Sequence, residues 1–285
     1  TITGGEIHGS VIGGDTFGSG NVTGNTVTIT GGEIHRFVFG GAGHESANVT
    51  GNTVTITGGE IRDHVYGGFT YGDGDVTGNI VNIGDGAHDL AAGTRIQQSI
   101  YGGSNDGGSG TISGNILNVK ASASAQNIHN FDKINFHFTN TLSPKLTLSG
   151  TAVTTIKSLR DITVKGLPTA VTGTLIENAN GITVTDSSSV TKTGDTAETT
   201  LSTDTTRKKI DYTRYIFKGA RTAESSSFHE TWGGRSVIGN TTTGNDVALA
   251  SGSYASAYGG WTSGTGTSAA DKGNSHDNTV IVKES

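Results

Sequence analysis

GNTVTITGGEIHRFVFGG, residues 24–41, returns 27 residues later as GNTVTITGGEIRDHVYGG, residues 51–68. The same markers occur outside these two units, as Gly4-Gly5-Glu6-Ile7-His8, Ile100-Tyr101-Gly102-Gly103 and Gly114-Asn115. A unit of this length cannot bury an apolar face by itself, whereas stacked copies bury a continuous core. A strict period of this kind therefore indicates a solenoid.

Each unit contains a strictly alternating stretch, residues 25–30 in the first quoted copy, in which Val27 and Ile29 face one way and the threonines face the other. Period-two alternation predicts a strand with one buried face. We expect each inward residue to sit about 4.8 Å from its equivalent in the next turn, so that Ile29 lies on Ile56. Residues 34–39 are expected to form a second short strand, and the Gly pairs to mark turns.

The fold class that this period predicts is all-β, a right-handed parallel β-helix with rungs of about 27 residues. Propeller blades need about 40 residues or more. We expect regular Gly/Thr-rich repeats over residues 1–120, irregular rungs over 121–218 and Gly-rich repeats with longer loops over 219–285, all in one continuous solenoid. An insertion over residues 84–98 delays the fourth copy, and residues 185–206 are expected to form a long loop or an exposed hairpin.

Composition excludes several classes of function. A net charge of −6 with 15% charged residues argues against nucleic-acid binding, and the one basic run, Arg207-Lys208-Lys209, is interpreted as a solvated strand edge. The chain has 0 Cys, so it holds neither a disulfide nor a Cys-ligated metal. No apolar stretch of about 18 residues is present, so this segment is not expected to insert into a membrane. Because it opens with Thr1-Ile2-Thr3, in the middle of a repeat, we expect a fragment.

The two quoted units resemble the Gly/Thr-rich passenger repeats of large type V autotransporter adhesins of Gram-negative bacteria. Three further segments resemble the regions C-terminal to such repeats in those proteins: NIHNFDKINFHF (127–138), LIENANGITV (175–184) and AYGGWTSGTGTSAADKGNSHDNTV (257–280). Together they cover about two thirds of the chain, and because they are low in complexity they support the architecture better than any ligand. The resemblance implies export, display at the cell surface through a C-terminal outer-membrane anchor outside this segment, and a role in cell adhesion and virulence.

Two repeat columns could carry chemistry. Glu6, Glu33 and Glu60 recur at 27 residues, which places carboxylates about 5 Å apart, the separation that a retaining glycosidase uses. A column encoded by the repeat is more often a turn or solubility feature, and no nucleophile motif accompanies it, so we expect no enzyme. A column of asparagines is interpreted as a structural amide ladder rather than as a binding site; its members are Asn25, Asn52, Asn79 and Asn115.

Candidate metal ligands lie in the Gly-rich loops. Asp73 and Asp75, with Asp85 and Asp106 further along, are weak calcium candidates because the spacing of nonapeptide calcium repeats does not recur. The histidines at 8, 35, 44 and 64 are better explained as exposed polar positions than as ligands. We therefore expect no cofactor and no metal.

Two polar and aromatic surfaces remain. The threonine rows 1/28/55 and 3/30/57 form a grid like that of ice-binding solenoids, but it lasts three rungs, and pairing of strand-face threonines is the simpler reading. Trp232 and Trp261 are weak ligand-binding candidates, because aromatic rings anchor interfaces. Tyr258, like Tyr66 and Tyr101, is expected to pack on its neighbour along the stack.

The function predicted from the sequence is a non-catalytic adhesin or stalk that binds glycans or proteins on host or bacterial surfaces, with self-association as a further possibility. Two alternatives stay open. A polysaccharide-degrading β-helix enzyme predicts acidic residues that converge in a groove, and a structural spacer predicts no binding at all.

Overall fold

The computed structural model describes residues 1–139, 141–166, 172–186, 188–193 and 197–216, together with six short strands between residues 230 and 282. Contacts divide the chain into two compact units. The first comprises Thr1–Thr169, Thr174–Ser188 and Ser202–Asp211, and the second comprises Ala170–Gly173, Ser189–Leu201 and Tyr212–Ser285.

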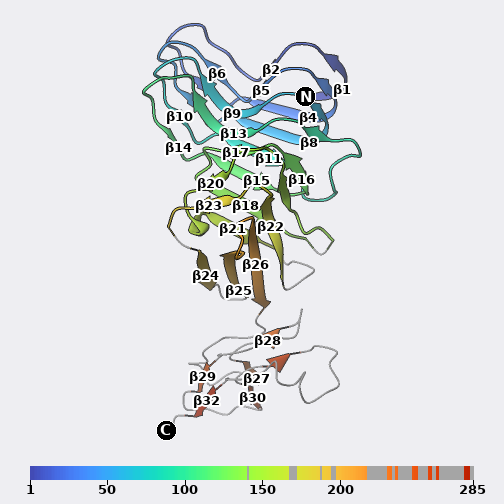
Figure 1. Ribbon diagram of the computed structural model, residues 1–285, viewed down its shortest axis with the longest axis vertical. Helices are drawn as coiled ribbons and strands as arrows, with labels where there is room; N and C mark the ends of the chain where they lie inside the picture. Colours follow the sequence, from blue (N-terminus) through green and yellow to red (C-terminus); the bar gives the residue numbers. More distant parts are fainter. Residues whose placement is uncertain are drawn as a thin grey trace. The chain divides into compact units, whose positions relative to one another are not determined.

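The first unit is a parallel β-solenoid of about seven turns (Figure 1). Its main sheet takes one strand from each turn, in the order β1 (Ile2–Ile7), β4 (Thr26–Ile34), β8 (Thr53–Ile61), β11 (Ile80–Ile83), β15 (Ile116–Val119), β18 (Lys133–His137) and β21 (Ile162–Lys165). A short strand, β12 (Arg95–Ile96), also pairs with β8. Every pairing in this sheet is parallel, as the solenoid prediction required.

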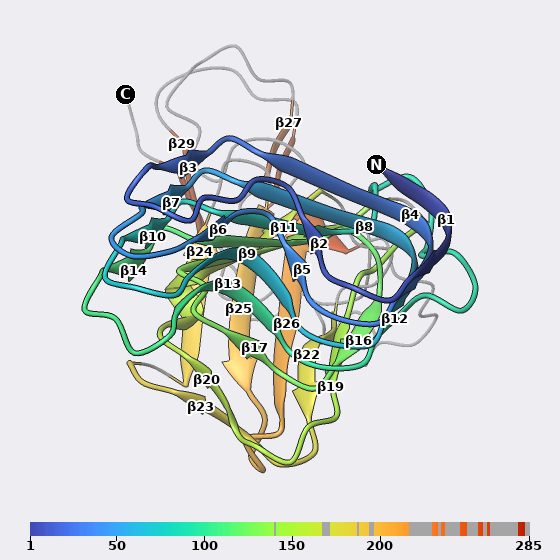
Figure 2. The ribbon, with the colours of Figure 1, turned by 90° about the horizontal axis from the view of Figure 1, so that it is seen from above.

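Two further sheets close the turns, and Figure 2 shows the three sheets around a narrow interior. One contains β2 (Val11–Ile12), β5 (Val38–Phe39), β9 (Val65–Thr70), β13 (Ile100–Asn105) and β17 (Ile128–His129), with β6 (Ala42–Gly43) also paired to β9. The other contains β3 (Val22–Thr23), β7 (Val49–Thr50), β10 (Val76–Thr77) and β14 (Ile112–Ser113).

Later strands keep the parallel pattern. Strand β16 (Ala123–Ala125) pairs with β19 (Leu146–Leu148), β19 with β22 (Thr172–Asn178), and β20 (Thr154–Ile156) with β23 (Ile182–Val184). A single 3-10 turn, Leu159–Asp161, precedes β21. The next strands along the chain are β24 (Ser189–Thr193), β25 (Ala197–Thr203) and β26 (Lys209–Ile216).

The described part of the second unit adds three parallel pairs. These are β27 (Glu230–Trp232) with β30 (Ser256–Tyr258), β28 (Arg235–Ser236) with β31 (Trp261–Thr262), and β29 (Asp246–Leu249) with β32 (Thr279–Val282). Within the described part of the chain, no helix is long and apolar enough to cross a membrane.

The core of the solenoid is a set of stacked columns. Ile29 pairs in register with Ile56, and Ile56 with Ile83, which confirms the predicted stacking. The column continues through Val119 and Phe136, and all five side chains are fully buried. Burial of each one contributes about 1.5–3 kcal/mol to folding, so the interior column stabilises the stack.

The Gly pairs of the main sheet lie inside strands, which corrects the expectation that every pair marks a turn, whereas Gly13-Gly14 and Gly40-Gly41 do follow the ends of β2 and β5. Gly31 and Gly32 lie inside β4, and the register shifts there by one residue, so that Thr30 pairs with Gly58 rather than with Thr57. Gly32 has φ +89, a conformation that L side chains rarely adopt, so the glycine lets the strand bend without breaking. The threonine row 3/30/57 is therefore not in register.

The predicted second strand over residues 34–39 was also wrong in extent. Ile34 is the last residue of β4, and only Val38 and Phe39 form β5. The bend at Gly32 lets β4 continue through the apolar Ile34, which is fully buried. The intervening residues 35–37 are then outside both strands.

The insertion over residues 84–98 is confirmed by the change in pairing distance. Strand β11 still pairs with β8 at the 27-residue period, Ile83 against Ile56, whereas Arg95 pairs with Glu60, 35 positions earlier. The extra residues thus leave the solenoid between β11 and β12.

Residues 185–206 contain a hairpin: the Thr191 and Thr200 hydroxyls lie 2.9 Å apart, and the Thr203 N–H donates to the Ser188 carbonyl.

Candidate functional site

A column of carboxylates runs down one side of the solenoid, where β1, β4 and β8 pass their Gly bends. Glu6 pairs in register with Glu33, and Glu33 with Glu60, so the predicted Glu column is confirmed. Arg95 takes the position after Glu60. Turns stacked at the spacing of a parallel sheet bring these carboxylates close together, so their repulsion has to be offset by neighbouring groups.

Each carboxylate is met by the side chain two positions after the residue that pairs with it in the next turn, which is Glu33 for Glu6, Glu60 for Glu33 and Arg95 for Glu60. His35 Nε2 lies 2.8 Å from Glu6 Oε1, Arg62 forms an ion pair with Glu33, and Gln97 donates a hydrogen bond to Glu60. We call this arrangement of Glu6, Glu33 and Glu60 with His35, Arg62 and Gln97 the Glu staircase. Its partners offset the repulsion within the column and link each turn to the next.

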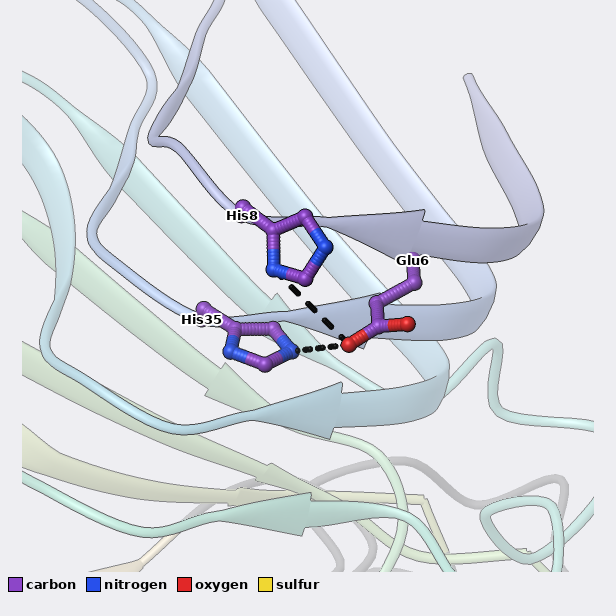
Figure 3. Close-up of side chains that lie close together, drawn as sticks. All are labelled: Glu6, His8 and His35. Atoms are coloured by element: carbon purple, nitrogen blue, oxygen red, sulfur yellow. Dashed lines mark ion pairs between the residues drawn. The ribbon is translucent and has the colours of Figure 1, made fainter.

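The upper end of the staircase holds a mixed cluster of one carboxylate and two imidazoles (Figure 3). His8 Nδ1 lies 3.8 Å from Glu6 Oε1, and the His8 and His35 ring centroids are 4.7 Å apart. One ligand atom from each of the three residues lies within 4.8 Å of the others. In the described residues this is the one group of three His, Asp or Glu side chains so arranged. The sequence interpretation took His8 and His35 for exposed polar positions rather than ligands, and it did not connect them with Glu6.

The calcium candidates are engaged by donors of the following turn. Asp73 Oδ1 accepts hydrogen bonds from the Ser109 N–H at 2.8 Å and the Ser109 hydroxyl at 3.1 Å, and these bonds lower the pKa of Asp73. Asp75 Oδ1 accepts from the Thr111 N–H at 2.7 Å. These bonds give both aspartates a structural role, and calcium binding there stays a prediction.

The asparagine column forms the predicted amide ladder. Asn25, Asn52 and Asn79 each donate through Nδ2 to the side-chain oxygen of the next asparagine, at 2.9, 3.0 and 3.2 Å, ending on Asn115. The same oxygens accept the backbone N–H groups of the turn above. Because Asn52, Asn79 and Asn115 are fully buried, this ladder is a structural element rather than a binding surface.

Aromatic rings form two stacked columns along the solenoid, one on the strands of the β5–β13 sheet and one in the residues that follow these strands. In the first, Tyr66 stacks on Phe39 at 5.1 Å and on Tyr101 at 4.8 Å, and Tyr101 stacks on His129 at 4.5 Å, as the expected tyrosine stacking required. Burial raises the pKa of Tyr66 and lowers the pKa of His129, so both rings are neutral at pH 7. We call this set the inner aromatic ladder.

A second column, the outer aromatic ladder, contains Phe17, His44 and Tyr71. His44 stacks on Phe17 at 4.6 Å and on Tyr71 at 4.7 Å. Phe17 is 79% exposed and Tyr71 49% exposed, so two large apolar rings face solvent. Trp232, Trp261 and Tyr258 belong to β27, β31 and β30, but their side chains lie outside the described part of the chain.

The described part of the first unit includes two hollows. One is lined by Ile182, Val184, Thr185, Asp186, Ser188, Thr203 and Arg207. The other lies beside the 84–98 insertion and is lined by residues 90–94, 122–124, Lys145 and Thr147. Neither brings two carboxylates together, which is the arrangement that glycoside hydrolysis requires.

No family model, curated protein or solved structure matches this chain. What it does is therefore inferred from its own residues. The features that bear on function are the stacked core, the Glu staircase with its His-rich end, and the exposed outer aromatic ladder.

Proposed function

We propose that this chain is a segment of an adhesin displayed on the surface of a Gram-negative bacterium, of the autotransporter passenger type, and that it binds without catalysis. The observation that carries the proposal is the in-register stacking of about seven parallel turns, joined by side-chain ladders as well as by backbone bonds. Such a stack holds its outward side chains in fixed positions. It suits a scaffold that presents a surface to a partner.

The partners of the stacked carboxylates support a non-catalytic role. A glycosidase needs one carboxylate that activates water or attacks the sugar and a second, protonated carboxyl group that protonates the leaving-group oxygen. In the Glu staircase, Glu33 is paired with Arg62, and Glu6 lies 2.8 Å from His35. The polysaccharide-degrading alternative therefore has less support than binding.

The outer aromatic ladder is the binding surface that this proposal assigns. Exposed aromatic rings beside polar groups are enriched where proteins contact partners. Phe17 and Tyr71 keep their edges in solvent, while His44 between them fixes both rings. The proposed partners are glycans or proteins on host or bacterial surfaces, including another copy of this chain.

The test is binding of the purified full chain to host cells, to bacteria and to a glycan array. The double variant Phe17→Ala/Tyr71→Ala is expected to lose most of the binding, at least tenfold in affinity. Val153→Ala is the matched control, because Val153 is an apolar side chain as exposed as Tyr71, at 49%, and lies outside the ladder. This control should bind as the parent does.

Three results would count against the proposal. Release of reducing sugars from a polysaccharide by the parent chain would establish the enzyme instead. Absence of binding to any cell, matrix or glycan would favour a structural spacer. Equal loss of binding in the control and in the double variant would remove the outer aromatic ladder as the binding surface.

A further inference from the structure

We infer that Glu6, His8 and His35 form a binding site for a late first-row divalent metal ion, with Zn²⁺ as the representative ion. The three side chains come from two consecutive turns: Glu6 and His8 from the first, at and just after the end of β1, and His35 from the second, just after β4. Figure 3 shows both imidazoles turned toward the same carboxylate oxygen. The inference is independent of the adhesin proposal.

The separations between donor atoms suit a bound ion. Zn²⁺ binds imidazole nitrogen and carboxylate oxygen at 2.0–2.2 Å with tetrahedral geometry, which sets ligand atoms about 3.4 Å apart. Glu6 Oε1 lies 2.8 Å from His35 Nε2 and 3.8 Å from His8 Nδ1. These two distances bracket the required separation, and the remaining pair, His8 and His35, has its ligand atoms within 4.8 Å. The His8 and Glu6 side chains are 77% and 53% exposed, so small rotations to the final geometry meet little resistance.

The ligand types select the class of ion. Imidazole nitrogen is a ligand of Zn²⁺, Cu²⁺ and Ni²⁺, whereas Ca²⁺ and Mg²⁺ take oxygen ligands. Two imidazoles and one carboxylate fill three positions of a tetrahedral site and leave the fourth for water. Glu33 Oε1 also lies 3.2 Å from His35 Nε2, but Arg62 pairs with this carboxylate and competes for it, so Glu33 is assigned to the ion pair.

The next turn lacks the site because of one residue. Arg62 occupies the position that His35 has in the turn above, since both meet the Glu of the preceding turn. A guanidinium stays protonated and is not a metal ligand. Glu33, His35 and position 62 therefore repeat the geometry of the site with one ligand missing, and Arg62→His supplies that ligand.

The experiment is calorimetric titration of the full chain, stripped with a chelator, with Zn²⁺ alone. The parent is expected to bind one ion. Glu6→Gln, His8→Ala and His35→Ala are each expected to weaken binding at least tenfold. The matched control is His88→Ala, because His88 is also an exposed histidine beside a carboxylate, 3.1 Å from Asp85, and no described residue completes a group of three ligands there. It should bind as the parent does, and Ca²⁺ should not compete.

The decisive variant is His8→Ala/Arg62→His, which moves the complete ligand set down one turn and is expected to restore binding of one ion. Far-UV circular dichroism establishes that each variant is folded. The inference is overturned if the parent does not bind Zn²⁺, if His88→Ala weakens binding as much as His35→Ala does, or if the folded double variant binds no better than His8→Ala.

Discussion

Replacement of Asn79 by alanine removes the centre of the buried amide ladder. The Asn79 side chain makes four hydrogen bonds: its oxygen accepts from the Asn52 N–H at 2.9 Å and Asn52 Nδ2 at 3.0 Å. Its Nδ2 donates to Asn115 Oδ1 at 3.2 Å and to the Val49 carbonyl at 3.0 Å. Each bond contributes about 1 kcal/mol net, and the buried Asn52 N–H is left without its partner. We expect Asn79→Ala to lower the free energy of unfolding by about 3–5 kcal/mol.

The matched control is Asn82→Ala, three residues later on the outer face of β11. Asn82 donates to Thr55 at 3.1 Å and accepts from Asn118 at 2.8 Å, but all three side chains are only half-buried. Water can replace these partners, so the expected loss is below about 1 kcal/mol. Urea unfolding followed by far-UV circular dichroism measures both. If the two variants lose stability equally, the claim that the buried ladder stabilises the stack is refuted.

Three further predictions concern a close approach of two backbones, the core and one turn. Gly67→Ala places a Cβ 2.6 Å from a carbonyl oxygen of the next turn, so we expect the free energy of unfolding in urea to fall by more than about 2 kcal/mol. The control Gly9→Ala, where nothing lies within 4 Å of the added Cβ, should lower it by less than about 0.5 kcal/mol. Ile56→Ala truncates a fully buried member of the central column, and we expect it to cost about 2–5 kcal/mol by the same assay, a loss below about 1 kcal/mol being the contrary result. Hydrogen bonds from the Thr206 hydroxyl and from backbone N–H groups lower the pKa of Asp204 to about 2. The stability that this carboxylate adds is therefore fully present above its ordinary pKa of 3.8 and is lost as the pH falls through about 2. A carboxyl NMR titration measures this pKa, and a midpoint near 3.8 would show that the turn bonds are absent.

The stacking could be predicted because the sequence repeats at the distance at which the backbone pairs. When one turn takes 27 residues, Ile29 and Ile56 occupy the same place in consecutive turns, and the same holds for Asn25 and Asn52. Where the period lapses, alternation still identifies the strand: Ile134 pairs with Leu117, 17 positions earlier. That register could not be read from the sequence, since turns of different length leave no fixed spacing.

The Gly bends were misread because Gly pairs are more often found in turns than inside strands. What decides the matter is the flanking sequence, since Ile34 after Gly31-Gly32 supplies an inward side chain that keeps the strand paired beyond the bend. The one-residue shift that pairs Thr30 with Gly58 is a consequence of this bend. Alternation counted straight through the glycines misses such a shift.

The grouping of Glu6 with His8 and His35 was missed for a different reason. A search for repeats compares like positions, and it finds Glu6 over Glu33. The contact that builds the cluster joins Glu6 to His35, two positions beyond one full period, and His8 recurs at that position only once before Arg62 replaces it. Contacts offset along the strand depend on the direction in which side chains lean, which sequence spacing does not give.

Disulfide cross-linking tests the stacked turns most directly, because the chain has 0 Cys and any pair introduced is the only one present. Thr28 and Thr55 are partners in adjacent parallel strands, and both lie half-buried on the outer face. Adjacent strands place paired Cα atoms within the roughly 4.4–6.8 Å that a disulfide spans, whereas residues two strands apart are too far. We predict that Thr28→Cys/Thr55→Cys oxidises within one molecule and that Thr28→Cys/Asn82→Cys, which spans two turns, does not. Equal oxidation of both pairs, or of the second alone, would contradict the in-register parallel stack.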